Sequence, residues 1–407
     1  MRIVINDYSG HPFQVQLSRE LARRGHDLLH LHFSDFQTPK GDLELRADDP
    51  SSLAIEGVSL GVPFEKSTFV RRRRQEIAYG HEACRRLQSF RPDIVVGCNN
   101  PLDAQHVIQN WCGNASVPFV FWLQDLYSIA ITEVLSRKFS LPGAFVGRHY
   151  QRLERRMLRA SAAIVAISND FLRQLQAWNI DTGKAVVIPN WAPLDALQVR
   201  PKVNPWSLRT GLSDQSLVVY TGTLGFKHNP QSLVHLAEVM SARVNTRVLV
   251  VSEGPGADYL TAEARARGLS NLVVLPFQPM AEYADVLGAA DILISIIEPD
   301  AARFSVPSKV LSYLCSGRAL VLSVPASNLA AQTVTACKAG ISVEPHDQQA
   351  FAAAITRLLD DPDERAAAGR AARRYAEQTF DIARIADRFE AIFDRVTGMT
   401  PIAVAAE

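Results

Sequence analysis

The sequence has few cysteines for its length. Five thiols occur among 407 residues, and no two of them form a C-x-x-C pair. Spacings this wide predict neither a zinc cluster nor a disulfide framework, so we interpret these residues as incidental thiols in a reducing compartment. The five are Cys84, Cys98, Cys112, Cys315 and Cys337.

An excess of charge of one sign is also lacking. The 43 Lys and Arg residues nearly balance the 42 Asp and Glu residues, which leaves a formal net charge of +1. Because nucleic-acid-binding domains are usually strongly basic, this balance argues against nucleic acid as a partner. Hydrophobic residues make up 47% of the chain, which argues against disorder and predicts a large folded core.

Long hydrophobic runs are absent. Two stretches without Asp, Glu, Lys or Arg, 104–124 and 319–337, are interrupted by Asn, Gln and Pro and do not suit a membrane span. The apolar run that follows Arg2 is too short for a signal peptide. We therefore expect a cytoplasmic protein.

The sequence does contain short apolar runs that alternate with helix-length amphipathic segments. Runs of Val, Ile and Leu are typical of parallel strands that helices cover on both faces. In the first half the expected strands are 2–5, 28–33, 93–97, 119–123, 162–167 and 185–188. In the second half they are 217–220, 247–251, 272–275, 291–296, 319–323 and 340–343. Because the alternation occurs twice, we predict an α/β fold of two doubly wound, Rossmann-like domains.

The domain boundary is expected where Pro193, Pro201 and Pro205 interrupt the periodicity. We assign residues 1–195 to the first domain and residues 205–379 to the second. Prolines at this density do not suit the interior of a helix or of a central strand, so a linker is the simplest interpretation.

Polar loops follow three expected strands of the second half. In open parallel sheets, ligands collect at the carboxyl ends of strands, where helix N-termini present N–H groups. The first loop contains Gly222, Thr223 and Lys227, the second Glu253 and Gly254, and the third Glu298 and then Val306, Pro307, Ser308 and Lys309. No P-loop and no dinucleotide-binding glycine pattern is present. Together the loops predict a diphosphate site, although each one alone also suits an ordinary strand–helix turn.

Two loops of the first half carry polar residues at strand ends. Gly10 and His11 follow the first strand, and Gln124 and Asp125 follow the strand at 119–123. We interpret them as candidate contacts to a substrate, with a locally hydrogen-bonded histidine and a helix-capping aspartate as the alternatives. No paired carboxylates, G-x-S-x-G or H-E-x-x-H motif indicates a hydrolase.

A basic amphipathic segment spans residues 137–159. It favours a helix whose cations face an anionic membrane surface, and a core-facing helix with a solvated basic face is the alternative. Phe145, Leu153 and Met157 are expected on one face of this helix. A second positive patch is expected at 71–74, four consecutive arginines. The arginines predicted to contact the membrane are Arg148, Arg152, Arg155, Arg156 and Arg159.

Taken in order along the chain, these features resemble the GT-B glycosyltransferases of family 4, in the branch that builds O-antigen, colanic acid and other exopolysaccharides. The segments that carry the resemblance are 21–26, 122–127, 163–168, 187–191, 222–227, 253–255, 290–291, 306–309 and 316–318. The resemblance implies two domains that face a cleft, the first on the acceptor side and the second for the nucleotide-sugar donor. It also implies that a helix at about 380–397 packs back on the first domain.

The resemblance assigns site residues where this sequence keeps the motifs. Lys227 and Lys309 match the residues that hold the donor diphosphate, and Asp125 matches the aspartate of a His-Asp pair, so these three are the predicted catalytic residues. The predicted donor-binding residues are Gly222, Thr223, Lys227, Glu253, Gly254, Phe277, Glu298, Val306, Pro307, Ser308 and Lys309. The predicted acceptor-side residues are Gly10, His11, Gln124 and Asp125.

Three departures from the family pattern accompany these matches. Thr223 stands in place of a basic residue, and Gln124 stands in place of the histidine of the pair. The two glutamates of the Glu-x7-Glu signature are replaced by Phe304 and Ser312. Glu298 is the remaining carboxylate that could reach the donor sugar.

The implied activity is transfer of a sugar from a nucleotide-diphosphate sugar, as co-substrate, to a lipid-linked saccharide acceptor. Retention of configuration and the absence of a bound metal or other cofactor are implied as well. We expect the enzyme at the inner face of the cytoplasmic membrane. Two alternatives stay open: a degenerate GT-B subunit that binds nucleotide or assists a partner transferase, and a GT-B sugar-nucleotide epimerase.

Overall fold

The computed structural model describes residues 1–36, 40–65, 68–138, 140–225, 228–298 and 308–398. Three predicted site residues, Lys227, Val306 and Pro307, lie outside this part of the chain. The described chain divides into two compact units. Unit 1 comprises Met1–Asn190 and the segment from Ile382, and unit 2 comprises Trp191–Asp381.

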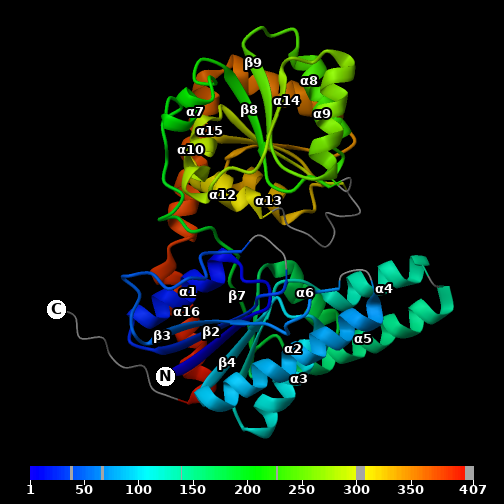
Figure 1. Ribbon diagram of the computed structural model, residues 1–407, viewed down its shortest axis with the longest axis vertical. Helices are drawn as coiled ribbons and strands as arrows, with labels where there is room; N and C mark the ends of the chain where they lie inside the picture. Colours follow the sequence, from blue (N-terminus) through cyan, green and yellow to red (C-terminus); the bar gives the residue numbers. More distant parts are fainter. Residues whose placement is uncertain (37–39, 66–67, 139, 226–227, 299–307, 399–407) are drawn as a thin grey trace. The chain divides into compact units, whose positions relative to one another are not determined.

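Unit 1 is built on a seven-stranded parallel sheet with the strand order β3-β2-β1-β4-β5-β6-β7 (Figure 1). The strands are β1 (Arg2–Asp7), β2 (Asp27–Phe33), β3 (Leu53–Val58), β4 (Ile94–Cys98), β5 (Phe119–Leu123), β6 (Ala163–Ala166) and β7 (Ala185–Val187). The sequence did not predict β3. It is an edge strand whose middle residues are only partly buried, so it lacks the continuous apolar run of a central strand.

Helices cover both faces of this sheet because successive strand residues point to opposite sides. Trp122 of β5 packs against Phe13 and Phe389, with ring centroids 5.9 and 4.8 Å away. Its neighbours Phe119 and Phe121 belong to the core on the opposite face. The helices are α1 (Pro12–Arg23), α2 (Phe69–Phe90), α3 (Leu102–Asn114), α4 (Tyr127–Lys138), α5 (Ser140–Ala160), α6 (Asn169–Ala177) and α16 (Ile382–Thr397).

The last helix, α16, packs on α1 although it is the most distant from it in sequence. Arg24, which follows α1, donates hydrogen bonds of 2.6 Å to Asp387 and to Glu390. The ring of His26 lies 2.8 Å from the other oxygen of Glu390. These partly buried ion pairs lie beside the apolar contact of Phe389, so polar and apolar contacts together hold α16 to unit 1.

Two long helices, α4 and α5, lie side by side at one side of unit 1 and extend away from the sheet (Figure 1). Leu153 and Met157 of α5 pack against the core, whereas the side chain of Phe145 is 75% exposed. The three residues predicted to share one helix face therefore have different surroundings. Among the described residues, no helix combines the length and the apolar character needed to cross a bilayer.

Unit 2 is built on a six-stranded parallel sheet with the strand order β10-β9-β8-β11-β12-β13. The strands are β8 (Ser216–Thr221), β9 (Thr246–Val251), β10 (Leu272–Leu275), β11 (Ile292–Ile296), β12 (Ala319–Ser323) and β13 (Gly340–Val343), each within one residue of the predicted bounds. The helices are α7 (Pro205–Arg209), α8 (Gln231–Met240), α9 (Pro255–Arg267), η2 (Met280–Glu282), α10 (Tyr283–Ala289), α12 (Lys309–Cys315), α13 (Leu329–Ala336), α14 (Gln348–Asp360) and α15 (Pro362–Thr379). The predicted α/β architecture of two doubly wound sheets is confirmed.

The strand order reverses beside the first strand of each sheet, between β1 and β4 in unit 1 and between β8 and β11 in unit 2. The loops that follow these strands run to opposite faces of the sheet. Ligands of open α/β sheets bind outside the carboxyl ends of the strands at such a reversal. These two reversals are therefore the expected ligand sites of the two units.

The packing of α16 generates a stability prediction. Phe389 is fully buried between α1 and β5, so Phe389→Ala should destabilise unit 1 by about 3–5 kcal/mol. Phe145→Ala, which truncates the same residue type at an exposed position, should change stability by less than about 0.5 kcal/mol. Urea unfolding followed by circular dichroism measures both. Equal effects of the two substitutions would contradict the assignment of α16 to the core of unit 1.

Candidate active site

In unit 2, β8 and β11 diverge toward their carboxyl ends. Their Cα pairing covers only Ile292 with Val218 and Leu293 with Val219, whereas β8 pairs with β9 along its whole length. The backbone N–H of Thr221 donates to the hydroxyl of Tyr313 on α12 at 2.9 Å. A buried N–H without an acceptor costs about 1–3 kcal/mol, so this tyrosine stabilises the open end of β8.

The ammonium group of Lys309 lies at this opening. Its Nζ is 3.5 Å from the centroid of the Tyr220 ring, a cation–π contact, and Lys309 is the first residue of α12. Gly222 follows β8 with φ of +102°, and a Cβ on it would lie 3.4 Å from Nζ. The glycine therefore allows the backbone conformation and leaves room for the lysine, so the structure brings these two predicted residues together.

The loop after β9 supports the loop after β8. A Cβ on Gly256 would lie 2.0 Å from the carbonyl oxygen of Leu224, so only glycine permits this close approach. Gly254, at φ +93°, precedes α9. The carboxylate of Glu253 accepts a hydrogen bond of 3.1 Å from the backbone N–H of Phe277, whose ring is 44% exposed. The structure thus joins the predicted residues Glu253 and Phe277.

The other predicted donor residues occupy the same edge of the sheet. The carbonyl of the exposed Thr223 accepts from the Tyr220 hydroxyl at 2.8 Å, and Ser308 is exposed at the N-cap position of α12. Glu298 follows β11 and lines a pocket of about 290 Å³. The remaining lining residues are Asn229, Pro230, Gln231 and Tyr259. A pocket of this size, with a carboxylate in its wall, can hold a sugar ring.

In unit 1, the reversal between β1 and β4 holds a buried polar cluster that was not among the residues predicted from the sequence. The carboxylate of Asp7 accepts hydrogen bonds from the backbone N–H of His11 at 2.6 Å and from the amide of Asn99 at 3.0 Å. Burial raises the pKa of Asp7, and the charge of His11 opposes this shift. Asn6 donates to Asn100 at 2.7 Å in the same cluster. The available signal was the position of these residues directly after buried strands.

The cluster positions Gly10 and His11. Gly10 has a φ of +73°, and its carbonyl accepts from the N–H of Gly41 at 2.8 Å. The ring of His11 is partly buried and stacks on Phe13, with ring centroids 6.0 Å apart. Asp7 therefore holds the backbone of this loop, while the imidazole of His11 lies at the sheet edge.

Gln124 and Asp125 follow β5 at the same edge, with β4 between them and the Gly10–His11 loop. The Gln124 side chain is buried and accepts from the amide of Asn190 at 2.6 Å. Burial raises the pKa of the partly buried Asp125 to about 7. At neutral pH this carboxyl is therefore divided between its protonated and ionised forms.

A second carboxyl, Glu154 of α5, titrates in the same range. Burial raises the pKa of Glu154 to about 7, hydrogen bonds from Ser128 oppose the shift, and the charge of Asp125 adds to it. The Ser128 hydroxyl donates to Glu154 at 2.5 Å, so this carboxyl is part of the packing between α4 and α5. Glu154 was not among the predicted site residues, because a single acid within a basic segment gives no local signal for such a role.

The predicted basic surface of α5 is only partly solvent-facing. Arg155 stacks on the Trp178 ring at 5.0 Å, and Arg159 donates to the carbonyl of Trp178 at 2.9 Å. These two arginines thus also stabilise the end of α6. Four of the five predicted arginines, Arg148, Arg152, Arg156 and Arg159, are exposed along the helix, and Arg155 is partly buried.

Solved structures with the same architecture cover nearly the whole chain. HepE of Anabaena, crystallised with UDP, is 15% identical over 97% of this chain and 100% of its own, with a TM-score of 0.69. Sucrose-phosphate synthase of Thermosynechococcus elongatus is 15% identical over 98% and 100%, with a TM-score of 0.73. WaaG, a glycosyltransferase involved in lipopolysaccharide biosynthesis, is 19% identical over 97% and 100%, with a TM-score of 0.67. These likenesses confirm the predicted GT-B fold.

Sequence profiles of two families match the two halves of the chain. The family described as Glycosyl transferase 4-like domain matches residues 11–191, and the family described as Glycosyl transferases group 1 matches residues 209–375. No curated protein sequence matches the chain. The two profiles together cover most of the chain, and the chain therefore belongs to the group 1 glycosyltransferases, retaining enzymes of the GT-B fold that use nucleotide sugars.

Proposed function

We propose that this glycosyltransferase moves a sugar from a UDP-sugar to a lipid-linked saccharide in the assembly of a cell-envelope polysaccharide such as O-antigen or exopolysaccharide. The observation that carries the donor assignment is the Lys309 ammonium beside Gly222 at the opening between β8 and β11. HepE, which has the same fold, is known with UDP and with UDP-glucose. The acceptor class is supported by the likeness to WaaG and by the basic helix α5.

Lys309 stabilises the leaving group in this mechanism. When the glycosyl bond breaks, the departing UDP gains negative charge on its diphosphate. An ammonium group that the fold already holds in place stabilises that charge without a proton transfer, and Lys227 is proposed as its companion. Each such lysine is worth about 2–4 kcal/mol of transition-state stabilisation, or about 30- to 1000-fold in rate.

The other donor residues bind the remaining parts of the UDP-sugar. Phe277, held by Glu253, presents an exposed ring on which the base can stack. Glu298 is proposed to accept hydrogen bonds from sugar hydroxyls in its pocket, in place of the missing Glu-x7-Glu contacts. The backbone of the donor loops is proposed to contact the phosphates and ribose at Gly222, Thr223, Gly254, Val306, Pro307 and Ser308.

The acceptor is proposed to bind to unit 1 through Gly10, His11, Gln124 and Asp125. An ionised Asp125 accepts a hydrogen bond from the acceptor hydroxyl and orients its oxygen for attack. A protonated Asp125 carries an O–H donor on one oxygen, and its other oxygen is a weaker acceptor than an ionised carboxylate. Because the pKa of Asp125 is raised to about 7, the acceptor site loses this contact as pH falls below neutrality.

Unit 1 is proposed to rest on the inner face of the cytoplasmic membrane, where a lipid-linked acceptor lies. The exposed Arg148 and Arg152 follow the exposed Phe145 along α5, a combination that suits an anionic bilayer surface. The ring of Phe69, at the start of α2, meets Tyr150 of α5 at 6.4 Å. This contact joins the start of α2 to α5, so the exposed arginines 71–74 are proposed to extend the basic surface of α5.

Nucleotide binding tests the donor site. Lys309→Gln should weaken UDP binding about tenfold to hundredfold, since a charged hydrogen-bond donor to the diphosphate is lost. Lys338→Gln is the matched control, because Lys338 is exposed before the amino end of β13, at the opposite edge of the sheet. Isothermal titration with UDP, GDP, dTDP, CDP and AMP measures both variants. Equal affinity of the two variants for UDP would exclude Lys309 as a contact to the diphosphate. The absence of binding by any of these nucleotides would favour a degenerate subunit.

The pH dependence of transfer tests Asp125. The value of kcat/KM should rise with pH with a midpoint near 7 and level off once the carboxyl is fully ionised, because it must lose its proton to accept from the acceptor. Asp125→Asn should lower the rate and abolish this step in the pH profile of kcat/KM. Glu154→Gln is the control, since its carboxyl titrates in the same range but is bonded to Ser128. A step that survives in Asp125→Asn and disappears in Glu154→Gln would assign the titration to Glu154.

Vesicle binding tests the membrane surface. The double variant Arg148→Gln/Arg152→Gln should partition onto anionic vesicles about 30-fold more weakly, at about 1 kcal/mol for each cation. Arg85→Gln/Arg173→Gln removes the same charge from exposed positions on α2 and α6 and should have little effect. Flotation with and without phosphatidylglycerol measures the partition. No flotation of the unchanged enzyme with either lipid would remove the membrane from the proposal.

A further inference from the structure

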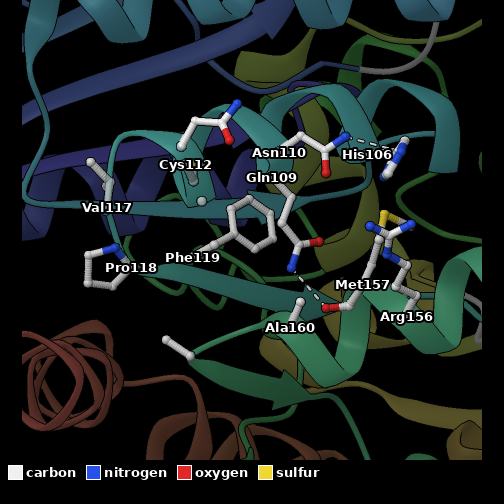
Figure 2. A pocket seen from close by; sticks show the side chains of 13 residues that line it. His106, Gln109, Asn110, Cys112, Val117, Pro118, Phe119, Arg156, Met157 and Ala160 are labelled. Carbon is white, nitrogen blue, oxygen red and sulfur yellow. Dashed lines mark hydrogen bonds between the residues drawn. The ribbon is translucent and has the colours of Figure 1, made fainter.

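A second pocket, of about 310 Å³, lies in unit 1 away from the predicted site residues (Figure 2). Its lining residues come from α3, α5 and the amino-terminal ends of β5 and β6. The candidate acceptor residues follow the carboxyl ends of β1 and β5, at the other edge of the sheet. An occupant of this pocket therefore does not take part in the transfer itself.

One side of the pocket is polar and carries a cation. In Figure 2 the side chains of His106, Asn110 and Arg156 gather on that side. The amide of Asn110 donates to Nε2 of His106 at 3.1 Å, which leaves the Nδ1–H of the neutral ring as a donor. Burial and the charge of Arg156 lower the pKa of His106, which favours the neutral ring. Arg156 is exposed and forms no ion pair with any carboxylate of the described residues.

A buried hydrogen-bond acceptor in the pocket wall, the side chain of Gln109, is the second feature that bears on the ligand. Gln109 is 93% buried, and its amide donates to the carbonyl of Met157 at 2.8 Å and to the hydroxyl of Ser161 at 3.1 Å. These two bonds fix the orientation of the amide. The Oε1 of Gln109 accepts no hydrogen bond from any of the residues that the structure describes. Such an oxygen is costly to bury without a donor, so a ligand hydroxyl that reaches it on binding is stabilised.

The opposite side of the pocket is apolar. Val117, Pro118 and Phe119 lie there, across from the polar side chains (Figure 2). The pocket is at the lower end of the range of about 300–1,000 Å³ found for small-molecule sites, which suits a ligand of one sugar ring rather than a nucleotide sugar. The partly buried Val117 and Pro118 can pack against the C–H face of such a ring.

We propose that this pocket is a second ligand site, which binds a small hydroxylated organic anion of the sugar-phosphate class. Arg156 binds the phosphate, Gln109 accepts from a ring hydroxyl, and the apolar side covers the ring face. The site is suited to an effector because β5 connects it to Asp125 at the other end of the strand. The proposal does not depend on the donor or the acceptor assigned above, since a chain inactive in transfer would keep the pocket.

Calorimetric titration with glucose 6-phosphate, glucose and inorganic phosphate tests the proposal without membranes present. The sugar phosphate should bind more tightly than either glucose or phosphate alone. Arg156→Gln should weaken its binding about tenfold or more, and Arg156→Lys should restore part of the affinity. Arg152→Gln is the matched control: it removes a charge one turn away on the same helix, at a residue that does not line the pocket.

Two results would overturn the proposal. One is the absence of saturable binding of glucose 6-phosphate to the folded enzyme. The other is equal affinity of Arg156→Gln and Arg152→Gln, which would mean that the helix acts only through its overall charge. Thermal unfolding of Arg156→Gln shows whether the variant is folded. If it is not, the affinity of Arg156→Lys for glucose 6-phosphate tests the site instead. A loss of vesicle binding that is specific to Arg156→Gln, without sugar-phosphate binding, would assign the pocket to a lipid headgroup instead.

Discussion

The divergence of β8 and β11 is the constraint on which the donor side depends. A parallel sheet normally pairs its backbone groups continuously, but here the two central strands pair at only two residues. The N–H of Thr221 is left facing the gap and is paired with the hydroxyl of Tyr313 instead. That bond fixes α12, and Lys309 at its start then lies over Tyr220 beside Gly222. The position of the cation thus follows from how one backbone group is satisfied.

At the strand reversal of unit 1, buried polar side chains take the place of the gap found in unit 2. β1 and β4 pair over five residues, so no comparable gap opens between them. The polar side chains of Asp7 and Asn99 instead fill the edge and bind each other and the following loop. Two related sheets therefore place a cation at one reversal and a buried carboxylate at the other. This difference suits a diphosphate on unit 2 and hydroxyl groups on unit 1.

Strand β5 has a different chemistry at each end. At its carboxyl end, burial raises the pKa of Asp125 to about 7, and the nearby carboxyl of Glu154 titrates in the same range. At its amino end, Phe119 forms part of a pocket with a cation and a buried amide. Helix α5 contributes a residue to each place, since the buried Glu154 accepts from Ser128 and Arg156 lines the pocket. A ligand at one end therefore has a direct structural connection to the titrating groups at the other.

The sequence by itself determined the strands that are buried on both faces, because continuous apolar runs are legible without any knowledge of neighbours. It also placed Gly222, Glu253 and Glu298 just after strands, and Lys309 further along the loop that contains Glu298. It missed the edge strand β3, whose residues are partly exposed and carry no such run. Only the tertiary structure decided that Tyr313 completes the end of β8 and that the Gln109 amide is fixed with an unsatisfied oxygen. Such pairings join residues that are distant in sequence, and no local pattern specifies which distant group a buried hydrogen-bonding atom will meet.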